Sequence, residues 1–266
     1  MCGRYILTET VEILEKRFNV TVPESVQINP SFNISPGKFA PVITNERPEV
    51  IQLYRFGLTP FWSKKSSMLF INARAEGDQN PEDDPNYKGA KGIITKPSFR
   101  KPIRSQRCLI PADAFIEGPA VEKLNKPYVV YLQNKVRPFA MAGIWDQWTN
   151  QETGDVINSF AIITTVANLL LQKINHPRSP VILHPDQERM WLSNDLPLAE
   201  VTGMLNPYPY ELMNAYPVSP AIKNPKADEP GLIQPVGERI MPEYEIKSSQ
   251  SLRLEGMGNR GRHKFL

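Results

Sequence analysis

The residue with the most unusual potential chemistry in this sequence is Cys2, in the opening Met1-Cys2-Gly3-Arg4. Methionine aminopeptidase removes an initiator Met when the next residue is small, as Cys is. The product would carry an amine and a thiol on adjacent carbons of one residue. An α-amine has a pKa of roughly 7.7–8.0, so an appreciable fraction is neutral and nucleophilic near pH 7. We therefore expect Cys2 to act as a nucleophile toward carbonyl groups.

An aldehyde is the electrophile that suits this pair of groups. The amine forms a Schiff base, and the thiol of the same residue then closes onto the imine carbon. Because the second step is intramolecular, its effective molarity can reach about 10⁵ M or more. The resulting five-membered thiazolidine resists hydrolysis better than an open imine. The ring-opened deoxyribose of an abasic site is such an aldehyde.

A plainer interpretation is that Cys2 is an inert residue at the start of a strand, because free cysteines are usually core residues. Cys108, inside an apolar run, is expected to be one of these. The choice for Cys2 depends on what else the chain offers.

Three further segments carry groups that could move protons or hold phosphates. Asn72 offers an amide donor and acceptor, and Arg74, two residues later, offers a rigid guanidinium fork. Glu117 ends an apolar run, where partial burial would raise its pKa and suit it to proton transfer. His176 could shuttle protons near neutral pH, and Arg178 could bind phosphate. Each residue alone is equally compatible with a structural or solvated role.

Composition limits the possible classes of protein. The 266 residues are 41% hydrophobic, which is enough for one sizeable core. The net charge of +3 excludes a strongly basic coat, so any phosphate binding must come from a local patch. No run of 18 apolar residues predicts a membrane span, and the N-terminus lacks the apolar stretch of a signal peptide. We expect a monomer in the cytoplasm.

Cysteine usage and loop patterns bear on cofactors. The 2 cysteines make no disulfide framework, which fits a reducing compartment, and they leave no zinc-ligand spacing. No phosphate-cradling Gly-rich loop is visible. We therefore expect no cofactor and no metal.

Hydrophobic patterns predict short helices scattered among many strands. A helix is expected over residues 8–18 with Thr8 as N-cap, and two strands over 38–56 around a turn at 45–49. The remaining expected elements are strands at 107–115, interrupted by Pro111, at 126–133, 137–145 and 159–165, and helices at 167–174 and 186–192, the second with Pro185 in its first turn. Without regular βαβ alternation, the pattern predicts an α+β fold with a largely antiparallel sheet or open barrel.

Two segments stand apart from this pattern. Residues 77–92 contain Gly, Pro and Asp but hardly any apolar residue, which predicts an exposed insertion. Its acidic residues would repel phosphate if they lay over a DNA groove, so we expect the insertion to point away. Residues 247–266 are expected to form a mobile C-terminal tail.

Taken together, the segments from Cys2 to about Val236 resemble the SRAP family (SOS response-associated peptidase), and residues 1–246 are expected to form one SRAP domain. The landmarks in chain order are Met1-Cys2-Gly3-Arg4, 32–37 (FNISPG), 56–62 (FGLTPFW), 72–76 (NARAE), 98–100 (SFR), 108–117, 141–145 (MAGIW), 176–183, 216–219 (YPVS) and 232–235 (LIQP). The resemblance implies the SRAP fold, an α+β domain with a mostly antiparallel, barrel-like core and short helices under a DNA-binding groove.

The resemblance also implies a function in the response to DNA damage. It implies that Cys2 traps an abasic site in single-stranded DNA as a covalent DNA–protein crosslink. Asn72 would orient the Cys2 amine and the sugar, Glu117 would be the general acid/base, and His176 would assist ring opening and crosslink reversal. The implied DNA contacts are Arg4, Arg74 and Arg178 for phosphates, and Asn33, Pro36, Phe61 and Trp62 along the lip of the groove. One departure is Gly118, where the family usually has an aromatic residue, so one stacking surface is missing or supplied elsewhere.

Other functions remain open from the residues. Cys2, His176 and Asn72 could form the Cys–His–Asn arrangement of a thiol peptidase, confined to self-processing or adduct release. An N-terminal-nucleophile glutamine amidotransferase also begins Met-Cys-Gly, but it needs glutamine-binding motifs and a synthase domain that are not visible. A non-covalent single-strand binder would leave Cys2 idle. The preferred hypothesis is an enzyme with lyase-like crosslinking activity on abasic DNA, with a thiol hydrolase as the alternative.

Overall fold

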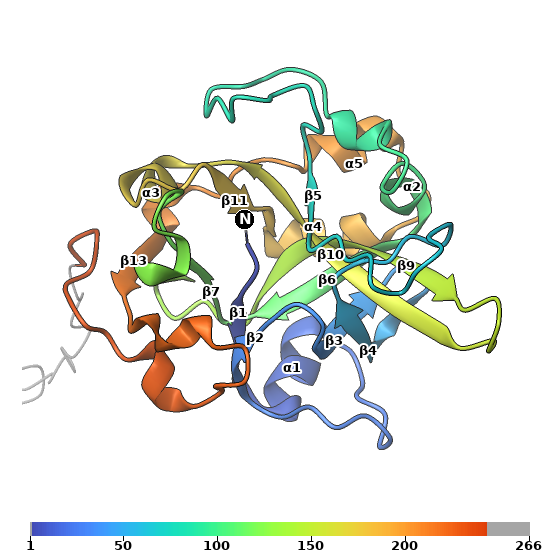
Figure 1. Cartoon of the computed structure of the whole chain (residues 1–266), viewed down its shortest axis with the longest axis horizontal. Coiled ribbons are helices and arrows are strands. Elements are labelled where there is room, and N and C mark those ends of the chain that lie inside the picture. The colour runs from blue at the N-terminus through green and yellow to red at the C-terminus, as the bar shows by residue number, and fades with distance from the viewer. Residues whose placement is uncertain (1, 244–266) are drawn as a thin grey trace, which may run out of the picture.

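A closed five-stranded β-barrel is the centre of the fold in the computed structural model, which describes residues 2–243 (Figure 1). The barrel follows the order β10–β4–β3–β6–β9 and returns to β10. Every pairing is antiparallel except that of β10 with β4. The strands are β3 (Phe39–Thr44), β4 (Arg47–Phe56), β6 (Arg107–Ala112), β9 (Phe139–Thr149) and β10 (Val156–Val166).

The second half of β10 carries two short strands that matter for the site. Toward the end of β10, where its pairing with β4 and β9 stops, β5 (Asn72–Arg74) pairs with it in parallel and β11 (Arg178–Pro180) pairs with it antiparallel. Arg74 lies opposite Thr164, and Arg178 lies opposite Val166. The same stretch of β10 therefore brings two arginines together from segments far apart in the chain. A further strand, β12 (Ile182–Leu183), pairs with β9.

A second, five-stranded sheet lies beside the barrel, in the order β13–β8–β7–β1–β2. Its strands are β1 (Tyr5–Leu7), β2 (Ser31–Ile34), β7 (Ala114–Glu117), β8 (Tyr128–Leu132) and β13 (Met213–Pro217). Only Asp113 separates β6 from β7, so the chain passes from the barrel into the second sheet at this residue. Because β1 pairs antiparallel with β7, the first residues of the chain lie beside the end of β7.

Helices are short and lie around the strands. The α-helices are α1 (Val11–Phe18), α2 (Pro102–Ser105), α3 (Leu169–Lys173), α4 (Pro185–Leu192) and α5 (Leu198–Gly203). Single 3₁₀ turns are η1 (Gly92–Ile94), η2 (Lys123–Asn125), η3 (Tyr210–Leu212), η4 (Pro220–Lys223) and η5 (Pro230–Ile233). Within residues 2–243, no helix has the length and apolar character needed to cross a membrane.

Aromatic side chains fill the contact between the barrel and the second sheet. Phe56 of β4 and Phe160 of β10 stack with ring centroids 5.3 Å apart, and Tyr5 of β1 meets Phe56 edge-on at 5.7 Å. All three are fully buried. Burial of such large rings dominates core stability, so this cluster fixes β1 against the barrel.

The structure confirms the expected α+β class with a barrel core, and it corrects two local predictions. The first helix has Thr10 as its N-cap instead of Thr8, because the backbone N and Oγ1 of Thr8 both donate to Asp113. Pro111 does not interrupt its strand: β6 runs through it, since β6 pairs with β3 only at Cys108 and Leu109. Pro111 then lies where one side of the strand needs no donor. The expected tail at 247–266 lies outside the described residues.

Phe160→Ala should lower the free energy of unfolding by about 3–5 kcal/mol, because it leaves a cavity against Phe56. Urea denaturation measures the loss. Phe39→Ala is the matched control, since Phe39 is 63% exposed on a strand of the same barrel and should change stability by about 0.5 kcal/mol or less. Equal losses for the two variants would contradict this account of the core.

Candidate functional site

The pairing of β1 with β7 places Cys2 against Glu117. Tyr5 lies opposite Phe115, and the backbone N of Ile116 donates to Arg4 O at 2.9 Å. Continuing this antiparallel register brings the residues before Arg4 to the end of β7, where Glu117 stands. The Cys2 thiol and the Glu117 carboxylate are hydrogen-bonded, and both side chains are buried.

Asn72 holds the backbone of Cys2 from a second direction. Its Nδ2 donates to Cys2 O at 2.9 Å from the start of β5. Its Oδ1 is buried, and residues 2–243 offer it no hydrogen-bond partner. The amide therefore fixes the position of Cys2 while its oxygen remains an acceptor directed into the site.

His176 reaches Glu117 from the loop after α3. Its Nδ1 lies 2.7 Å from Gly118 O, and because a carbonyl only accepts, Nδ1 carries the proton. Its Nε2 lies 3.2 Å from Glu117 Oε2. Burial lowers the pKa of His176 to about 4, so the ring is neutral at pH 7 and Nε2 is an acceptor. A hydrogen bond between His176 Nε2 and Glu117 Oε2 therefore requires that Glu117 is protonated.

Glu117 is placed to exchange protons near neutral pH. Burial raises the pKa of this carboxyl to about 7. Burial, followed by the nearby Glu117 carboxylate, raises the pKa of the Cys2 thiol well above its usual range. A neutral thiol and a neutral imidazole thus flank a carboxyl that is close to half-protonated at pH 7.

Gly118 departs from the expected aromatic residue for a steric reason. A Cβ at this position would lie 1.9 Å from the backbone oxygen of Lys123 in η2. No larger residue fits while η2 approaches this closely, and the carbonyl of Gly118 is the group that orients His176.

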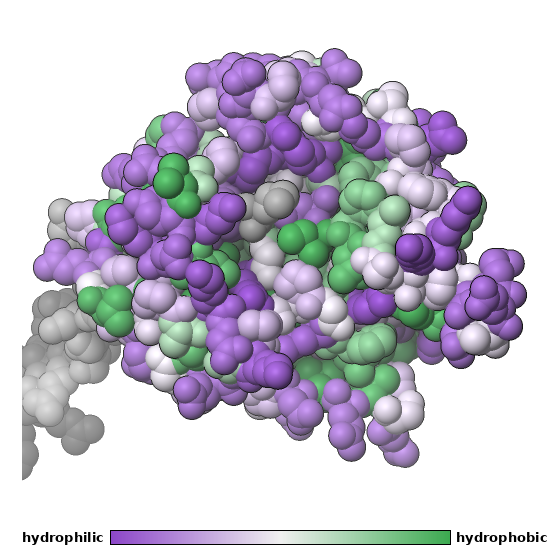
Figure 2. Space-filling model, in the orientation of Figure 1, coloured by the Kyte–Doolittle hydropathy of each residue, from purple (hydrophilic) through white to green (hydrophobic). Residues whose placement is uncertain are grey.

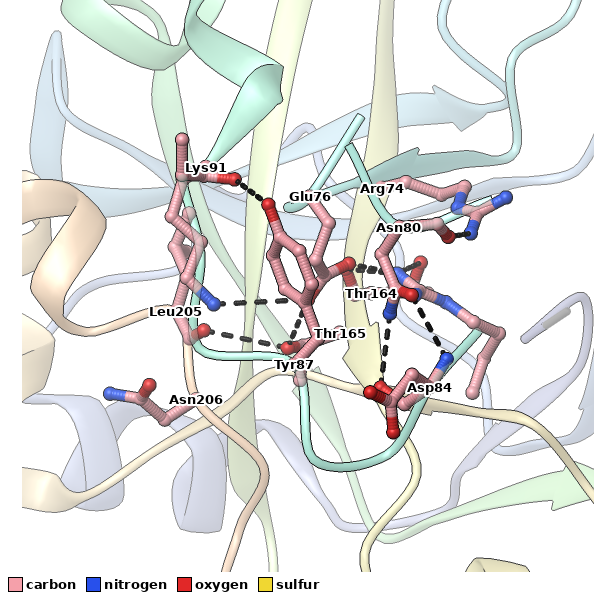
Figure 3. Close-up of polar contacts among 12 residues, drawn as sticks. Arg74, Glu76, Asn80, Asp84, Tyr87, Lys91, Thr164, Thr165, Leu205 and Asn206 are labelled. Carbon is pink, nitrogen blue, oxygen red and sulfur yellow. Dashed lines mark hydrogen bonds and ion pairs between the residues drawn. The ribbon is translucent and has the colours of Figure 1, made fainter. Parts of the chain in front are cut away.

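Glu76 is a site residue whose role the sequence interpretation missed. Its carboxylate is fully buried, accepts from Arg178 Nη2 at 2.7 Å and from Thr165 Oγ1 at 2.7 Å, and lies 3.7 Å from Lys91 Nζ (Figure 3). Burial alone would raise its pKa, but Arg178 and the hydrogen bonds lower it below its usual value. The period-two pattern could have indicated this role, because Ala73 and Ala75 are buried and alternate with Asn72, Arg74 and Glu76.

The expectation that residues 77–92 point away from the groove is wrong for Asp83, which contacts two of the residues expected to bind phosphate. The segment is largely exposed, as predicted, and forms the long loop between β5 and α2 at the top of Figure 1. However, Asp83 Oδ1 accepts from Arg74 Nη2 at 2.6 Å and from Arg178 Nη1 at 3.1 Å. Opposite charge brings the loop onto the basic pair instead of turning it outward.

A cavity of about 350 Å³ lies beside these arginines, and Asn72, whose amide holds Cys2, is one of its lining residues. Its walls include Asn72, Arg74, Arg178 and the rings of Phe70 and Phe99, which meet edge-on at 5.6 Å. The cavity thus has both cationic groups and apolar walls, which suits a sugar–phosphate unit.

The expected lip of the groove is only partly present. Phe61 and Trp62 are 51% and 45% exposed, and Pro36 is exposed in the turn before β3. Lys101 Nζ lies 4.8 Å above the Phe61 ring. In the view of Figure 2, apolar surface lies near the centre of the molecule, below strongly polar surface.

Arg4, another expected phosphate contact, is less exposed than these residues. Its Nη2 donates to Lys223 O at 3.1 Å, and its Nη1 is buried without a partner among residues 2–243.

Asn33 requires a correction, because it does not lie on the lip. It is fully buried, and its Nδ2 donates to the carbonyls of Ile222, Asn224 and Ala227. Its side chain holds the segment around η4 against β2, so its role is structural and it is not among the proposed DNA contacts.

Comparisons with known proteins identify the family and the fold. The family model described as SOS response associated peptidase (SRAP) matches residues 1–225. Abasic site processing protein YoqW of Bacillus subtilis (strain 168) is 34% identical over 241 residues, covering 88% of this chain and 99% of its own. Abasic site processing protein HMCES of Pongo abelii is 25% identical over 311 residues, covering 99% of this chain and 84% of its own. A crystal structure of a Bacteroides thetaiotaomicron protein superposes with a TM-score of 0.74 and 27% identity, covering 89% of this chain and 100% of its own.

The raised pKa of Glu117 predicts a pH-dependent difference in stability. Between its ordinary value of 4.5 and about 7, the folded protein holds a proton that the unfolded chain releases, so unfolding becomes easier as pH rises through this window. Gln does not titrate and can donate to His176 as the protonated acid does. The unfolding free energy of Glu117→Gln relative to wild type should therefore rise by up to about 3 kcal/mol from pH 4 to pH 8.

Urea denaturation across this pH range measures the difference. Glu122→Gln is the control and should show no such rise, because the hydrogen bond from Lys126 lowers the pKa of this surface carboxylate instead of raising it. A pH-independent difference between Glu117→Gln and wild type would contradict the burial account.

Proposed function

This chain belongs to the SOS response associated peptidase (SRAP) family, and on that premise we propose that it traps abasic sites in single-stranded DNA through Cys2. The observation that carries the proposal is that Asn72 and Glu117, from two separate segments, both contact the second residue of the chain, while His176 contacts Glu117 from a third. Removal of Met1 would expose the Cys2 amine at this point.

The first chemical step forms a C–N bond. The neutral Cys2 amine attacks the aldehyde carbon of the ring-opened sugar, and the carbinolamine then loses water to give an imine. Glu117 supplies the proton that makes the hydroxyl leave. Its pKa of about 7 lies close to the roughly 7.7–8.0 of an α-amine, so proton exchange between them is nearly balanced.

The second step forms a C–S bond and closes the ring. The Cys2 sulfur adds to the carbon of the protonated imine, whose nitrogen keeps its hydrogen, and the thiol proton passes to Glu117, replacing the proton that Glu117 gave to the leaving hydroxyl. The products are one thiazolidine and one water, with no oxidant or reductant. Because amine and thiol belong to one residue, closure needs no second encounter.

Asn72 and His176 position the reactants. The unused Oδ1 of Asn72 can accept from the Cys2 amine, while Nδ2 keeps the Cys2 carbonyl in place. His176 offers an acceptor at Nε2, since Gly118 holds the proton at Nδ1. That nitrogen can assist removal of the anomeric hydroxyl proton as the sugar ring opens, and the same group can assist reversal.

The single-stranded DNA is proposed to bind along the arginines and the exposed aromatic rings. Arg4, Arg74 and Arg178 would contact phosphates, and Phe61 and Trp62 would stack on bases. The proposal includes a monomeric protein in the cytoplasm, and the reaction as written uses no cofactor. Cys2 and Cys108 are both free thiols, as a reducing compartment would keep them.

A thiol peptidase is the weaker candidate. Such an enzyme activates its thiolate with an adjacent imidazolium, which lowers the thiol pKa. Here burial and Glu117 raise the pKa of the Cys2 thiol, and His176 Nε2 is directed to Glu117. The same lack of thiolate activation disfavours a glutamine amidotransferase. Addition to an imine beside a general base suits this thiol better.

Replacement of Cys2 separates the two chemical steps. Cys2→Ala still allows Met removal, so it keeps the α-amine and loses only the thiol. Incubated with single-stranded DNA bearing one abasic site, wild type should give a heat-stable adduct on a denaturing gel. Cys2→Ala should give an adduct only when borohydride reduces its Schiff base.

Cys108→Ala is the matched control, because it removes the other buried thiol and should leave the adduct intact. A heat-stable adduct from Cys2→Ala without borohydride would eliminate the thiazolidine mechanism. Binding that ignores the lesion and falls steeply with salt would favour a non-covalent binder instead.

A further inference from the structure

The acidic loop at 77–92 contacts the proposed phosphate site through Asp83. One oxygen of Asp83 accepts from Arg74 Nη2 and Arg178 Nη1, at 2.6 Å and 3.1 Å. A phosphate oxygen bound by the same two guanidinium groups would occupy this position. We propose that Asp83 is a built-in competitor of DNA, whose carboxylate fills the phosphate site until a strand displaces it. The inference rests on the proposed function and adds regulation to the same site.

The two carboxylates that contact Arg178 differ in how easily they can be displaced. Glu76 is 0% exposed and is held by Thr165 as well as by Arg178. The Asp83 side chain is 24% exposed, and that of Arg74 is 38% exposed. Partly solvated ion pairs contribute little net stability, whereas buried ones are costly to break. Glu76 therefore orients Arg178 permanently, and Asp83 forms the exchangeable contact.

Both arginines keep capacity for an anion. The Nε atoms of Arg74 and Arg178 are buried and have no partner among the described residues. Asp83 and both arginines line the 350 Å³ cavity that also contains Asn72, which holds Cys2. When DNA displaces Asp83, the guanidinium groups of Arg74 and Arg178 are free to bind a phosphate at this cavity, next to the sugar that would react.

The base of the loop is fixed, so a movement of Asp83 need not unfold it. Gly77 and Gly92, at the two ends, pass so closely that a Cβ on Gly77 would lie 2.8 Å from the Gly92 carbonyl carbon. A second acidic residue, Asp78, forms an ion pair with Lys96, which also lines the cavity. The loop thus presents two acidic groups to cationic groups on the cavity wall.

The contact has a consequence for selectivity. Competition by Asp83 weakens the phosphate contacts of every strand, whether damaged or not. An abasic strand recovers from this weakening because the covalent bond to Cys2 holds it, but an undamaged strand has no aldehyde. Asp83 would therefore reduce occupation of the site by intact single-stranded DNA more than it reduces capture of lesions.

The test compares Asp83→Asn with Asp84→Asn. The two variants change the net charge equally and lie next to each other, but Asp84 is exposed and its carboxylate accepts only from the backbone of Asn86 among the described contacts. Affinity for an undamaged single-stranded oligonucleotide is measured as a function of salt, and adduct formation is measured with the same strand carrying an abasic site.

Asp83→Asn should bind undamaged DNA about tenfold more tightly at low salt, and Asp84→Asn should change the affinity by less than about threefold. The log–log salt dependence of binding by Asp83→Asn should steepen by about 0.7 for each additional phosphate that the freed arginines neutralise. The ratio of lesion capture to undamaged binding should fall for Asp83→Asn alone.

If the two variants change the DNA affinity equally, Asp83 acts only through the net charge of the protein, and the proposal is overturned. Weaker binding by Asp83→Asn would also overturn it, since Asp83 would then orient the arginines for DNA. If no variant forms an adduct but Asp83→Asn still binds more tightly, the competitor role holds and the proposed crosslinking fails. If both variants form normal adducts and bind undamaged DNA alike, the crosslinking holds and the competitor role fails.

Discussion

The antiparallel pairing of β1 with β7 is the constraint on which the rest of the site depends. β1 has only three residues, yet it lies between β7 and β2 and is anchored by Tyr5 against the barrel. Cys2 precedes β1 directly, so a slip of one residue in this pairing would shift Cys2 along β7 and away from Glu117. The burial of Tyr5 thus fixes the reactive residue in place, and an N-terminal residue, which is usually poorly ordered, becomes part of the core.

The site is built from titratable groups that burial shifts toward their neutral forms. Glu117, His176 and the Cys2 thiol are buried together, and burial shifts the pKa of each toward its uncharged form. Charges are kept one layer away, where Glu76 and Arg178 neutralise each other. This separation leaves Glu117 able to gain or lose a proton near pH 7 and places strong cations where the proposal puts phosphates.

Much of this arrangement could be predicted from the sequence, and the remainder has physical reasons for being hidden. Runs of β-forming residues bounded by turn residues indicated the strands of the barrel, and the residue types of Asn72, Glu117 and His176 marked them as candidates. Asn33 was misplaced because an amide serves a buried backbone as well as a ligand. The contact of Asp83 with two arginines depends on how the long loop at 77–92 folds back, which no local pattern encodes.

The central claim is that the amine and the thiol of Cys2 bond to the same sugar carbon. Carbon NMR of the adduct, formed with DNA labelled with ¹³C at the aldehyde carbon of the abasic site, observes that atom directly. The account predicts the resonance of a saturated carbon that is bonded to one nitrogen and one sulfur. The resonance of an unsaturated imine carbon in the stable adduct, or of a carbon without a sulfur neighbour, would contradict it.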